Sequence, residues 1–181
     1  MNARAPRIVI TGFMGAGKTT VARALAARLG CTMLDTDESI VEREGRNIAA
    51  IIEGEGEARF REIEAAVLRD ALEGQEARVI ALGGGAWTLT ENRAAISAHD
   101  DCVTVWLDAP FALCWRRIAH AGHARPLARD RDHALALYTA RRAAYELATL
   151  RVQINEDRDA EDTAAQIESI IERQSVVEKR T

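Results

Sequence analysis

The chain has 181 residues, of which 48% are hydrophobic and 29% charged, a composition typical of one globular domain with a sizeable core. A net charge of −4 and an isoelectric point near 5.6 disfavour a nucleic-acid-binding function, which usually requires a basic excess. The apolar runs are too short for a signal peptide or a membrane span, and the three cysteines are widely spaced, so we expect a cytoplasmic protein without a membrane partner.

Two kinds of apolar segment alternate along the chain. Short β-branched runs predict buried strands, and longer runs with helical spacing predict helices. The predicted elements, in chain order, are a strand over 7–11, a helix from 18 that Gly30 ends, a strand over 31–37, a helix over 37–44, a helical segment over 47–74 with a glycine break, a strand over 78–85, a strand over 101–109, a helix from 111 that breaks near Gly122, a helix over 132–148, a strand over 150–155 and a helix over 159–174.

Strands that alternate with helices predict an α/β fold, in which helices cover both faces of a parallel sheet. Ligands of such sheets bind at the carboxyl ends of the strands. Three segments rich in glycine or aspartate lie at the carboxyl ends of predicted strands, at residues 12–19, 35–37 and 83–85. We therefore expect the functional site where these three segments meet.

Residues 12–19, GFMGAGKT, match the phosphate-loop (P-loop) pattern G-x-x-x-x-G-K-[ST], with a strand before and a helix after. In such a loop the backbone N–H groups point inward and the following helix directs the positive end of its dipole at the loop, so both attract a phosphate. The Lys18 ammonium would bridge the β- and γ-phosphates, and the Thr19 hydroxyl would bind Mg²⁺. Among 24 basic residues only Lys18 and Lys179 are lysines, and a compact ammonium fits among phosphate oxygens better than a planar guanidinium. The alternative interpretation is a glycine turn beside a solvated lysine.

A P-loop alone does not distinguish a GTPase, an ATPase and a small-molecule kinase. The chain has no N-K-x-D guanine signature, which disfavours a GTPase. Further segments that carry chemistry are DTD (35–37), FREIE (60–64), GGG (83–85), RPL (125–127) and RRAAY (141–145). With these segments in this order, the sequence from about Arg7 to Ala160 closely resembles the shikimate kinase family, which belongs to the nucleoside-monophosphate-kinase-like P-loop proteins.

The resemblance implies a three-layer α/β/α P-loop kinase fold with a central five-stranded parallel sheet. It also implies a single domain over 1–181 with a mobile lid over about 116–131, and we expect the tail over 174–181 to fray. The implied reaction is transfer of the γ-phosphate of ATP to the 3-hydroxyl of shikimate, in aromatic amino-acid biosynthesis. The implied partner is therefore a small molecule, and we expect a monomer.

The resemblance assigns a nucleotide side to the site, with ATP and Mg²⁺ as cofactors. Thr19 and, through water, Asp35 would hold Mg²⁺, while Arg125 would reach the transferring phosphate from the lid. Arg158 is the candidate for a basic residue near the adenine. The residues expected along the phosphates are Gly15, Ala16, Gly17, Lys18, Thr19 and Thr20.

The resemblance also assigns an acceptor side. Asp37 would bind the shikimate hydroxyls and orient or deprotonate the attacking one. Arg61 and Arg141 would grip the shikimate carboxylate, because a guanidinium pairs with a carboxylate through two hydrogen bonds. The backbone of Gly83, Gly84 and Gly85 would close over the ring, since glycines at a strand end allow a close ligand. The catalytic residues are then Lys18, Asp37 and Arg125.

Several interpretations stay open at the level of single residues. Asp35 and Asp37 could cap the next helix, and Arg61 could be a solvated helix arginine among glutamates. The lid reads RPLA and the later helix RRAAY, both unlike the usual family pattern, so Arg117 or Arg129 could meet the phosphate in place of Arg125. The adjacent Arg141 and Arg142 are both candidates, although the spacing to Tyr145 favours Arg141. The cysteines are expected to be small buried hydrophobes, and the tryptophans to serve packing.

Two other functions remain to be weighed. Gluconate kinase or another small-molecule kinase of the same fold would need a different acceptor pocket, which the set of Asp37, Arg61, Gly84 and Arg141 disfavours. A nucleotide-binding module without catalysis would be marked by loss of Lys18, Asp37 or Arg125, and all three are present.

Overall fold

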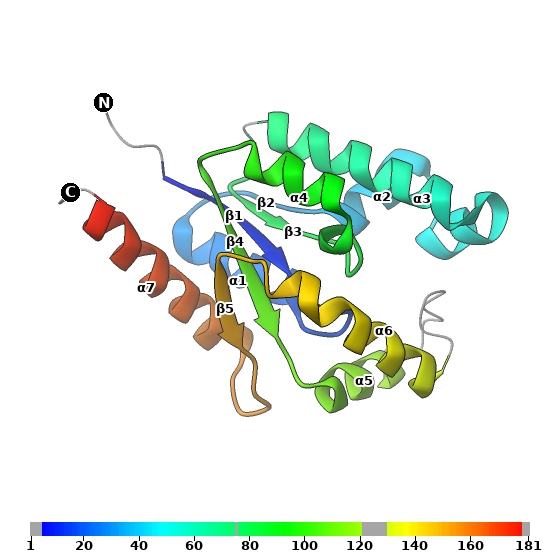
Figure 1. The fold of residues 1–181 in the computed structure, drawn as a ribbon. Helices are drawn as coiled ribbons and strands as arrows, with labels where there is room; N and C mark the ends of the chain where they lie inside the picture. Colours follow the sequence, from blue (N-terminus) through cyan, green and yellow to red (C-terminus); the bar gives the residue numbers. More distant parts are fainter. Residues whose placement is uncertain (1–4, 75, 121–129, 179–181) are drawn as a thin grey trace.

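A central sheet of five parallel strands organises the molecule (Figure 1), which is known from a computed structural model that describes residues 5–74, 76–120 and 130–178. The strands lie in the order β2-β3-β1-β4-β5, and each neighbouring pair is parallel. Their bounds are β1 (Arg7–Thr11), β2 (Met33–Asp35), β3 (Val79–Ala81), β4 (Cys102–Asp108) and β5 (Leu150–Gln153). The prediction of a five-stranded parallel sheet is confirmed.

Helices cover both faces of this sheet. Helix α1 packs against α7 on one side, while α3 and α4 lie together on the opposite side, and α5 and α6 lie beyond the carboxyl ends of the central strands (Figure 1). The bounds are α1 (Lys18–Leu29), α2 (Thr36–Glu44), α3 (Ile48–Glu73), the 3₁₀ helix η1 (Ala86–Thr88), α4 (Thr90–Ser97), α5 (Phe111–His120), α6 (Arg131–Tyr145) and α7 (Ala160–Glu178). The three-layer α/β/α architecture is therefore confirmed.

The position of β1 determines where the site lies. Ile8, Val9 and Ile10 have no exposed surface, because β1 pairs with β3 on one side and with β4 on the other. Strands buried on both faces tend to be continuously apolar, as the run RIVIT is. The carboxyl ends of three neighbouring strands consequently open on one space, which the segments after β1, β3 and β4 surround.

Helix α3 shows the predicted apolar face and the predicted break. Phe60, Ile63, Val67 and Ala71 are all buried, and the first three of these form a smaller core cluster with Ile40 of α2 and Ile51. This second cluster attaches α2 to α3 and so positions both helices beside the ends of β2 and β3. The break lies at Gly56, which leaves the helical conformation with φ of +87°.

Other elements differ from the sequence prediction. Neither η1 nor α4 was expected, because this stretch is short and buries only a few scattered side chains, so it lacks a helical apolar period. Helix α7 continues to Glu178, four residues past its predicted end at 174 and into the tail that was expected to fray. The predicted break near Gly122 and most of the predicted lid lie outside the described residues. Within the described parts of the chain, no helix is long and apolar enough to span a membrane.

The cysteines match their expectation in part. Cys114 is buried, whereas Cys31 and Cys102 are partly exposed, and all three are free thiols. Burial raises the pKa of both Cys102 and Cys114 to about 11, so these groups stay protonated at neutral pH. Trp87 and Trp106 are buried in the core, as expected for packing residues.

The assignment of the core predicts that substitutions of two leucines differ strongly in their effect on the free energy of unfolding. Leu68 on α3 is fully buried, so Leu68→Ala should lower the free energy of unfolding by about 2–5 kcal/mol. Leu147 is 63% exposed, so Leu147→Ala should change it by no more than about 0.5 kcal/mol. Urea unfolding followed by circular dichroism measures both, and similar losses in the two variants would contradict the described core.

Candidate active site

The loop between β1 and α1 has the shape of an anion cradle. Gly15 has φ of +78°, and a Cβ on this residue would lie 2.6 Å from the carbonyl oxygen of Cys114, so no side chain fits there. Gly17 precedes α1 in a left-handed conformation, and no side chain of the described residues caps this helix. The N–H groups of the first turn of α1 are therefore available to an anion, which the helix dipole also favours.

Lys18 and Thr19 begin α1 at the mouth of this loop. The Lys18 Nζ donates to the carbonyl oxygen of Phe13 at 3.2 Å, which keeps the ammonium folded over the loop. The Thr19 hydroxyl donates to Asp35 Oδ2 at 2.5 Å. The P-loop and the end of β2 are thus joined by a direct side-chain contact.

Asp35 has two roles, one of which is the capping role left open from the sequence. Its Oδ1 accepts the backbone N–H groups of Asp37 at 2.9 Å and Glu38 at 3.3 Å, so it caps α2. Its Oδ2 remains directed at Thr19, and the residue is 8% exposed. The Asp35 carboxylate and the Thr19 hydroxyl are oxygen donors of the kind that Mg²⁺ prefers. Since the described residues hold no cluster of three or more metal-ligating side chains, phosphate and water would have to complete the coordination.

A hollow of about 250 Å³ opens beside this pair. It is lined by Gly15, Gly17, Lys18, Thr19, Thr20, Asp35, Asp37, Leu82, Arg117 and Ile118. All predicted phosphate-binding residues except Ala16 therefore face the same space as the predicted acceptor-binding aspartate, as the convergence of strand ends requires.

The glycines after β3 lie against residues of the acceptor side and the P-loop. A Cβ on Gly83 would lie 2.5 Å from Asp37 Oδ1 and 2.7 Å from Glu64 Oε1. A Cβ on Gly84 would lie 3.2 Å from the backbone nitrogen of Met14 in the P-loop. Side chains in this segment would displace the carboxylates or the loop, so the close approach depends on glycine.

Arg61 reaches the same segment from α3. A Cβ on Gly85 would lie 2.7 Å from both terminal nitrogens of its guanidinium. The guanidinium pairs with Glu57 at 2.9 Å and Glu64 at 2.7 Å, and the Arg61 side chain is 16% exposed. Arg61 thus makes the expected helix ion pairs, yet it points into the site and is not a solvated surface arginine.

Helix α6 carries both Arg141 and Arg142, the two candidates for the acceptor site, and directs them to different partners. Arg141 is 9% exposed, and its Nη1 donates to the carbonyl oxygen of Gly84 at 3.2 Å. The Tyr145 hydroxyl donates to the same oxygen at 2.5 Å. Arg142 points elsewhere, to Asp108 at 3.0 Å. Of the two, Arg141 lies at the acceptor side.

Of the arginines expected near ATP, the structure describes Arg117 and Arg158. Arg125 and Arg129 lie outside the described residues. The Arg117 Nη1 donates to the carbonyl oxygen of Gly15 at 3.1 Å, so this arginine lies against the P-loop. A second hollow of about 260 Å³ beside the loop is lined by both Arg117 and Arg158, the candidate for the adenine.

Glu64 is a site residue that the sequence analysis missed. It is 1% exposed, its Oε2 pairs with Arg61, and its Oε1 has no hydrogen-bond partner among the described residues. Burial raises the pKa of the Glu64 carboxyl, and the charge of Asp37 adds to this, although Arg61 acts in the opposite direction. The sequence signal was its place three residues after Arg61 in FREIE, but glutamates on an amphipathic helix are usually solvated.

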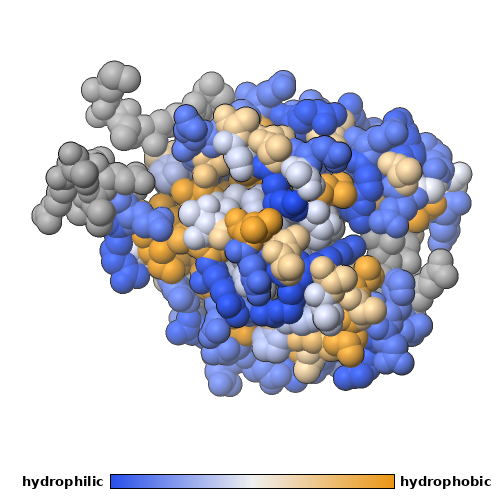
Figure 2. All heavy atoms as spheres, viewed as in Figure 1, coloured by the Kyte–Doolittle hydropathy of each residue, from blue (hydrophilic) through white to orange (hydrophobic). Residues whose placement is uncertain are grey.

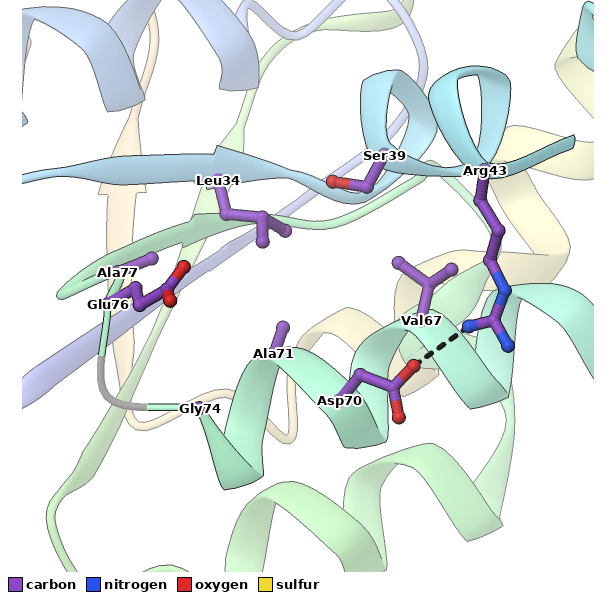
Figure 3. A pocket seen from close by; sticks show the side chains of 9 residues that line it. All are labelled: Leu34, Ser39, Arg43, Val67, Asp70, Ala71, Gly74, Glu76 and Ala77. Carbon is purple, nitrogen blue, oxygen red and sulfur yellow. Dashed lines mark hydrogen bonds and ion pairs between the residues drawn. The ribbon is translucent and has the colours of Figure 1, made fainter. Parts of the chain in front are cut away.

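A third hollow, of about 220 Å³, lies apart from this site (Figure 3). It lies between α2, α3 and the edge strand β2, with Leu34, Val67 and Ala71 among its lining residues and an Arg43–Asp70 ion pair of 2.8 Å at its margin. None of the predicted site residues lines it. The candidate active site is therefore the region around the P-loop.

A phosphate cradle, a pair of oxygen ligands for a metal and an acceptor pocket with carboxylates and arginines define the class of a P-loop small-molecule kinase. Comparison with known families agrees, since the shikimate kinase family model matches residues 14–172. The chain is 44% identical over 148 residues to the shikimate kinase of Ruegeria pomeroyi, covering 80% of this chain and 74% of that relative. It is 36% identical over 180 residues to the shikimate kinase of Salinibacter ruber, covering 93% and 86%.

Solved structures give the same result. Shikimate kinase from Acinetobacter baumannii, in complex with shikimate, matches with a TM-score of 0.87 and 34% identity, covering 94% of this chain and 95% of that one. A gluconokinase from Sinorhizobium meliloti matches with a TM-score of 0.61 and 20% identity over 94% and 98% of the chains, which is a similarity of fold alone. The chain belongs to the shikimate kinase family. It is an ATP-dependent phosphotransferase with an alcohol group as acceptor.

The burial of Glu64 predicts a pH-dependent stability difference. A carboxyl with a raised pKa in the folded state contributes stability below its ordinary pKa of 4.5, and that contribution is lost as the pH rises through the folded value. Glu64→Gln lacks this titration. The unfolding free energy of the wild type, relative to Glu64→Gln, should therefore fall as the pH rises above about 4.5 and through the raised pKa of the Glu64 carboxyl.

Urea unfolding at several pH values measures the difference. Glu57→Gln is the matched control, because Glu57 pairs with the same guanidinium but its side chain is 51% exposed and hydrated in both states. This variant measures the effect of losing one ion pair of Arg61 while the buried carboxyl of Glu64 stays in place. Parallel curves for the wild type and Glu64→Gln would show that Glu64 does not titrate differently in the folded protein.

Proposed function

We propose that the chain binds shikimate between Asp37, Arg61, Arg141 and the glycines 83–85, with ATP on the P-loop. The observation that supports this most directly is the convergence on those glycines, where the Asp37 carboxylate lies at Gly83, the Arg141 guanidinium at Gly84 and the Arg61 guanidinium at Gly85. Two arginines and one aspartate at three consecutive residues suit a ligand with a carboxylate at one end and hydroxyls at the other.

The two ends of shikimate call for different partners. Its carboxylate would lie between Arg61 and Arg141, which come from different helices and can each donate two hydrogen bonds. Its hydroxyls would donate to Asp37, which faces the P-loop hollow. Glu64, paired with Arg61, would keep that guanidinium in place.

The nucleotide would lie on the other side of Asp37. The backbone from Gly15 to Gly17 and the side chain of Lys18 would hold the β- and γ-phosphates, and Thr20 lines the same hollow. Thr19 and Asp35 would hold Mg²⁺, the latter through water. The ion, when bound, supplies positive charge that neutralises the phosphate oxygens.

Phosphoryl transfer requires in-line positioning and charge neutralisation more than covalent chemistry. Asp37 would orient the attacking hydroxyl and take its proton. Lys18 would stabilise the negative charge on the transferring phosphoryl group from the P-loop. Arg125 would do so from the lid, and Arg117 and Arg129 are the alternatives to Arg125. Arg117 lies against Gly15, which makes it the supported alternative among the described residues. Arg158 would lie beside the adenine, since it lines the hollow next to the P-loop.

The proposal also covers the oligomeric state of the protein and its location in the cell. Figure 2 shows hydrophobic residues lying among hydrophilic ones, and the large hydrophobic side chains that the described residues expose are Val41, Leu135 and Leu147. Such separate exposed residues suit a monomer. Free cysteines suit the reducing cytoplasm.

The substrate assignment is tested by coupled ADP release with Mg-ATP, with and without shikimate, and with gluconate as the comparison acceptor. ADP release should depend on shikimate. Turnover with gluconate but not with shikimate would identify a different small-molecule kinase, and ATP binding without any turnover would indicate a nucleotide-binding module.

Arg61→Ala should raise the KM for shikimate roughly ten- to hundred-fold, because a charge-assisted contact to a carboxylate is worth about 1.5–3 kcal/mol. The KM for ATP should change little. Arg59→Ala is the matched control, since Arg59 lies on the same helix in ion pairs with glutamates and its side chain is 51% exposed. Steady-state kinetics of both variants measure the effect, and equal changes in both KM values for Arg61→Ala would indicate a structural role instead.

A further inference from the structure

Arg142 has partners that the acceptor site does not explain. Its Nη1 donates to Asp108 Oδ1 at 3.0 Å and to the Tyr138 hydroxyl at 2.9 Å. Adjacent residues of a helix point about 100° apart, so Arg141 and Arg142 cannot exchange partners without moving α6. One arginine therefore faces the acceptor site while its neighbour faces the end of β4.

Asp108 is an anchor in the sheet that does not depend on α6. It is the last residue of β4, and its side chain is 10% exposed. Its Oδ2 accepts from Arg151 on β5, from Nε at 2.9 Å and from Nη2 at 2.5 Å. Because Arg151 fixes one oxygen from within the sheet, the other oxygen offers Arg142 a stationary partner.

Two aromatic rings, those of Trp106 and Tyr145, connect Arg142 to the acceptor site. The Arg142 guanidinium lies 5.1 Å from the centre of the Trp106 ring, and Trp106 stacks on Tyr145 at 6.1 Å. The Tyr145 hydroxyl in turn donates to the Gly84 carbonyl oxygen that Arg141 also contacts. A shift of Arg142 would therefore move Tyr145 and Arg141 together.

Helix α6 is held by polar contacts as well as by apolar packing. Of its 15 residues, Ala134, Arg141 and Tyr145 are the buried ones. Leu137 and Tyr138 are partly buried against the core. The Tyr138 hydroxyl adds a hydrogen bond to the Ala109 carbonyl oxygen at 3.0 Å, next to the contact with Arg142.

We propose that Arg142 is a positioning residue for the acceptor site, which holds α6 on Asp108 so that Arg141 and Tyr145 stay on the Gly84 carbonyl. This inference rests on the role proposed above for Arg141 as a ligand of the shikimate carboxylate. Arg142 itself touches neither substrate. Its contribution is to the affinity for shikimate and not to the binding of ATP.

The test compares Arg142→Gln with Arg151→Gln in steady-state kinetics. Arg151 is the matched control, because it pairs with the same carboxylate and lies 4.8 Å from the centre of the same Trp106 ring, but belongs to β5 and not to α6. Arg142→Gln should raise the KM for shikimate several-fold and leave the KM for ATP within about twofold. Arg151→Gln, which leaves the Arg142–Asp108 ion pair in place, should raise the KM for shikimate less than Arg142→Gln does. Arg142→Lys, which keeps a positive charge beside Asp108, should restore part of the loss.

A double-variant cycle shows whether Arg142 acts through Arg141. Arg141→Gln alone should raise the KM for shikimate, and adding Arg142→Gln to it should raise the KM much less than in the wild type. The inference is wrong if Arg142→Gln has no effect on this KM, if Arg151→Gln matches it, or if its full effect persists without Arg141. An Arg141→Gln variant with an unchanged KM would instead overturn the proposed role of Arg141, and the inference with it.

Discussion

The pairing of β1 between β3 and β4 is the constraint on which the site depends. Ile10 of β1 lies opposite Ala81 on one side and Val105 on the other, so the chain leaves all three strands at the same edge. The P-loop follows β1, the glycines follow β3, and Asp108 ends β4. The groups that we propose to bind phosphate, to bind the acceptor and to anchor α6 are therefore neighbours, because the strands that carry them are parallel and adjacent.

Charge in this region is concentrated and mostly compensated. Arg61 lies between Glu57 and Glu64, Asp35 accepts from Thr19 and the start of α2, and Asp108 lies between two arginines. Such pairing holds side chains in fixed rotamers before a ligand arrives, which lowers the entropy lost on binding. Arginine suits these positions because its planar group makes several directed contacts at once, whereas the P-loop uses the compact ammonium of Lys18.

The parts of the site that the sequence could predict are those with local patterns. The P-loop, the aspartates after β2 and the glycines after β3 are short motifs next to recognisable strands, and parallel pairing brings their ends together. The capping alternative for Asp35 also proved correct in part, because one oxygen of this carboxylate caps α2 while the other accepts from Thr19.

The rest depends on contacts that no local pattern encodes. The burial of Glu64 follows from how α3 lies on the end of β3, and FREIE alone resembles any charged helix. The Arg142–Asp108 pair joins residues 34 positions apart, so the different roles of two adjacent arginines become visible only in the folded chain. Helix α4 was missed because its short stretch has no apolar period to detect.

The central claim is that acceptor and nucleotide meet over the glycines between β3 and α4. A crystal structure with shikimate and a non-hydrolysable ATP analogue tests it most directly. We expect the shikimate carboxylate to lie within hydrogen-bonding distance of Arg61 and Arg141, with the 3-hydroxyl at Asp37 and facing the terminal phosphate on the P-loop. Shikimate bound away from these three side chains, or turned so that its carboxylate faces the phosphates, would contradict the account.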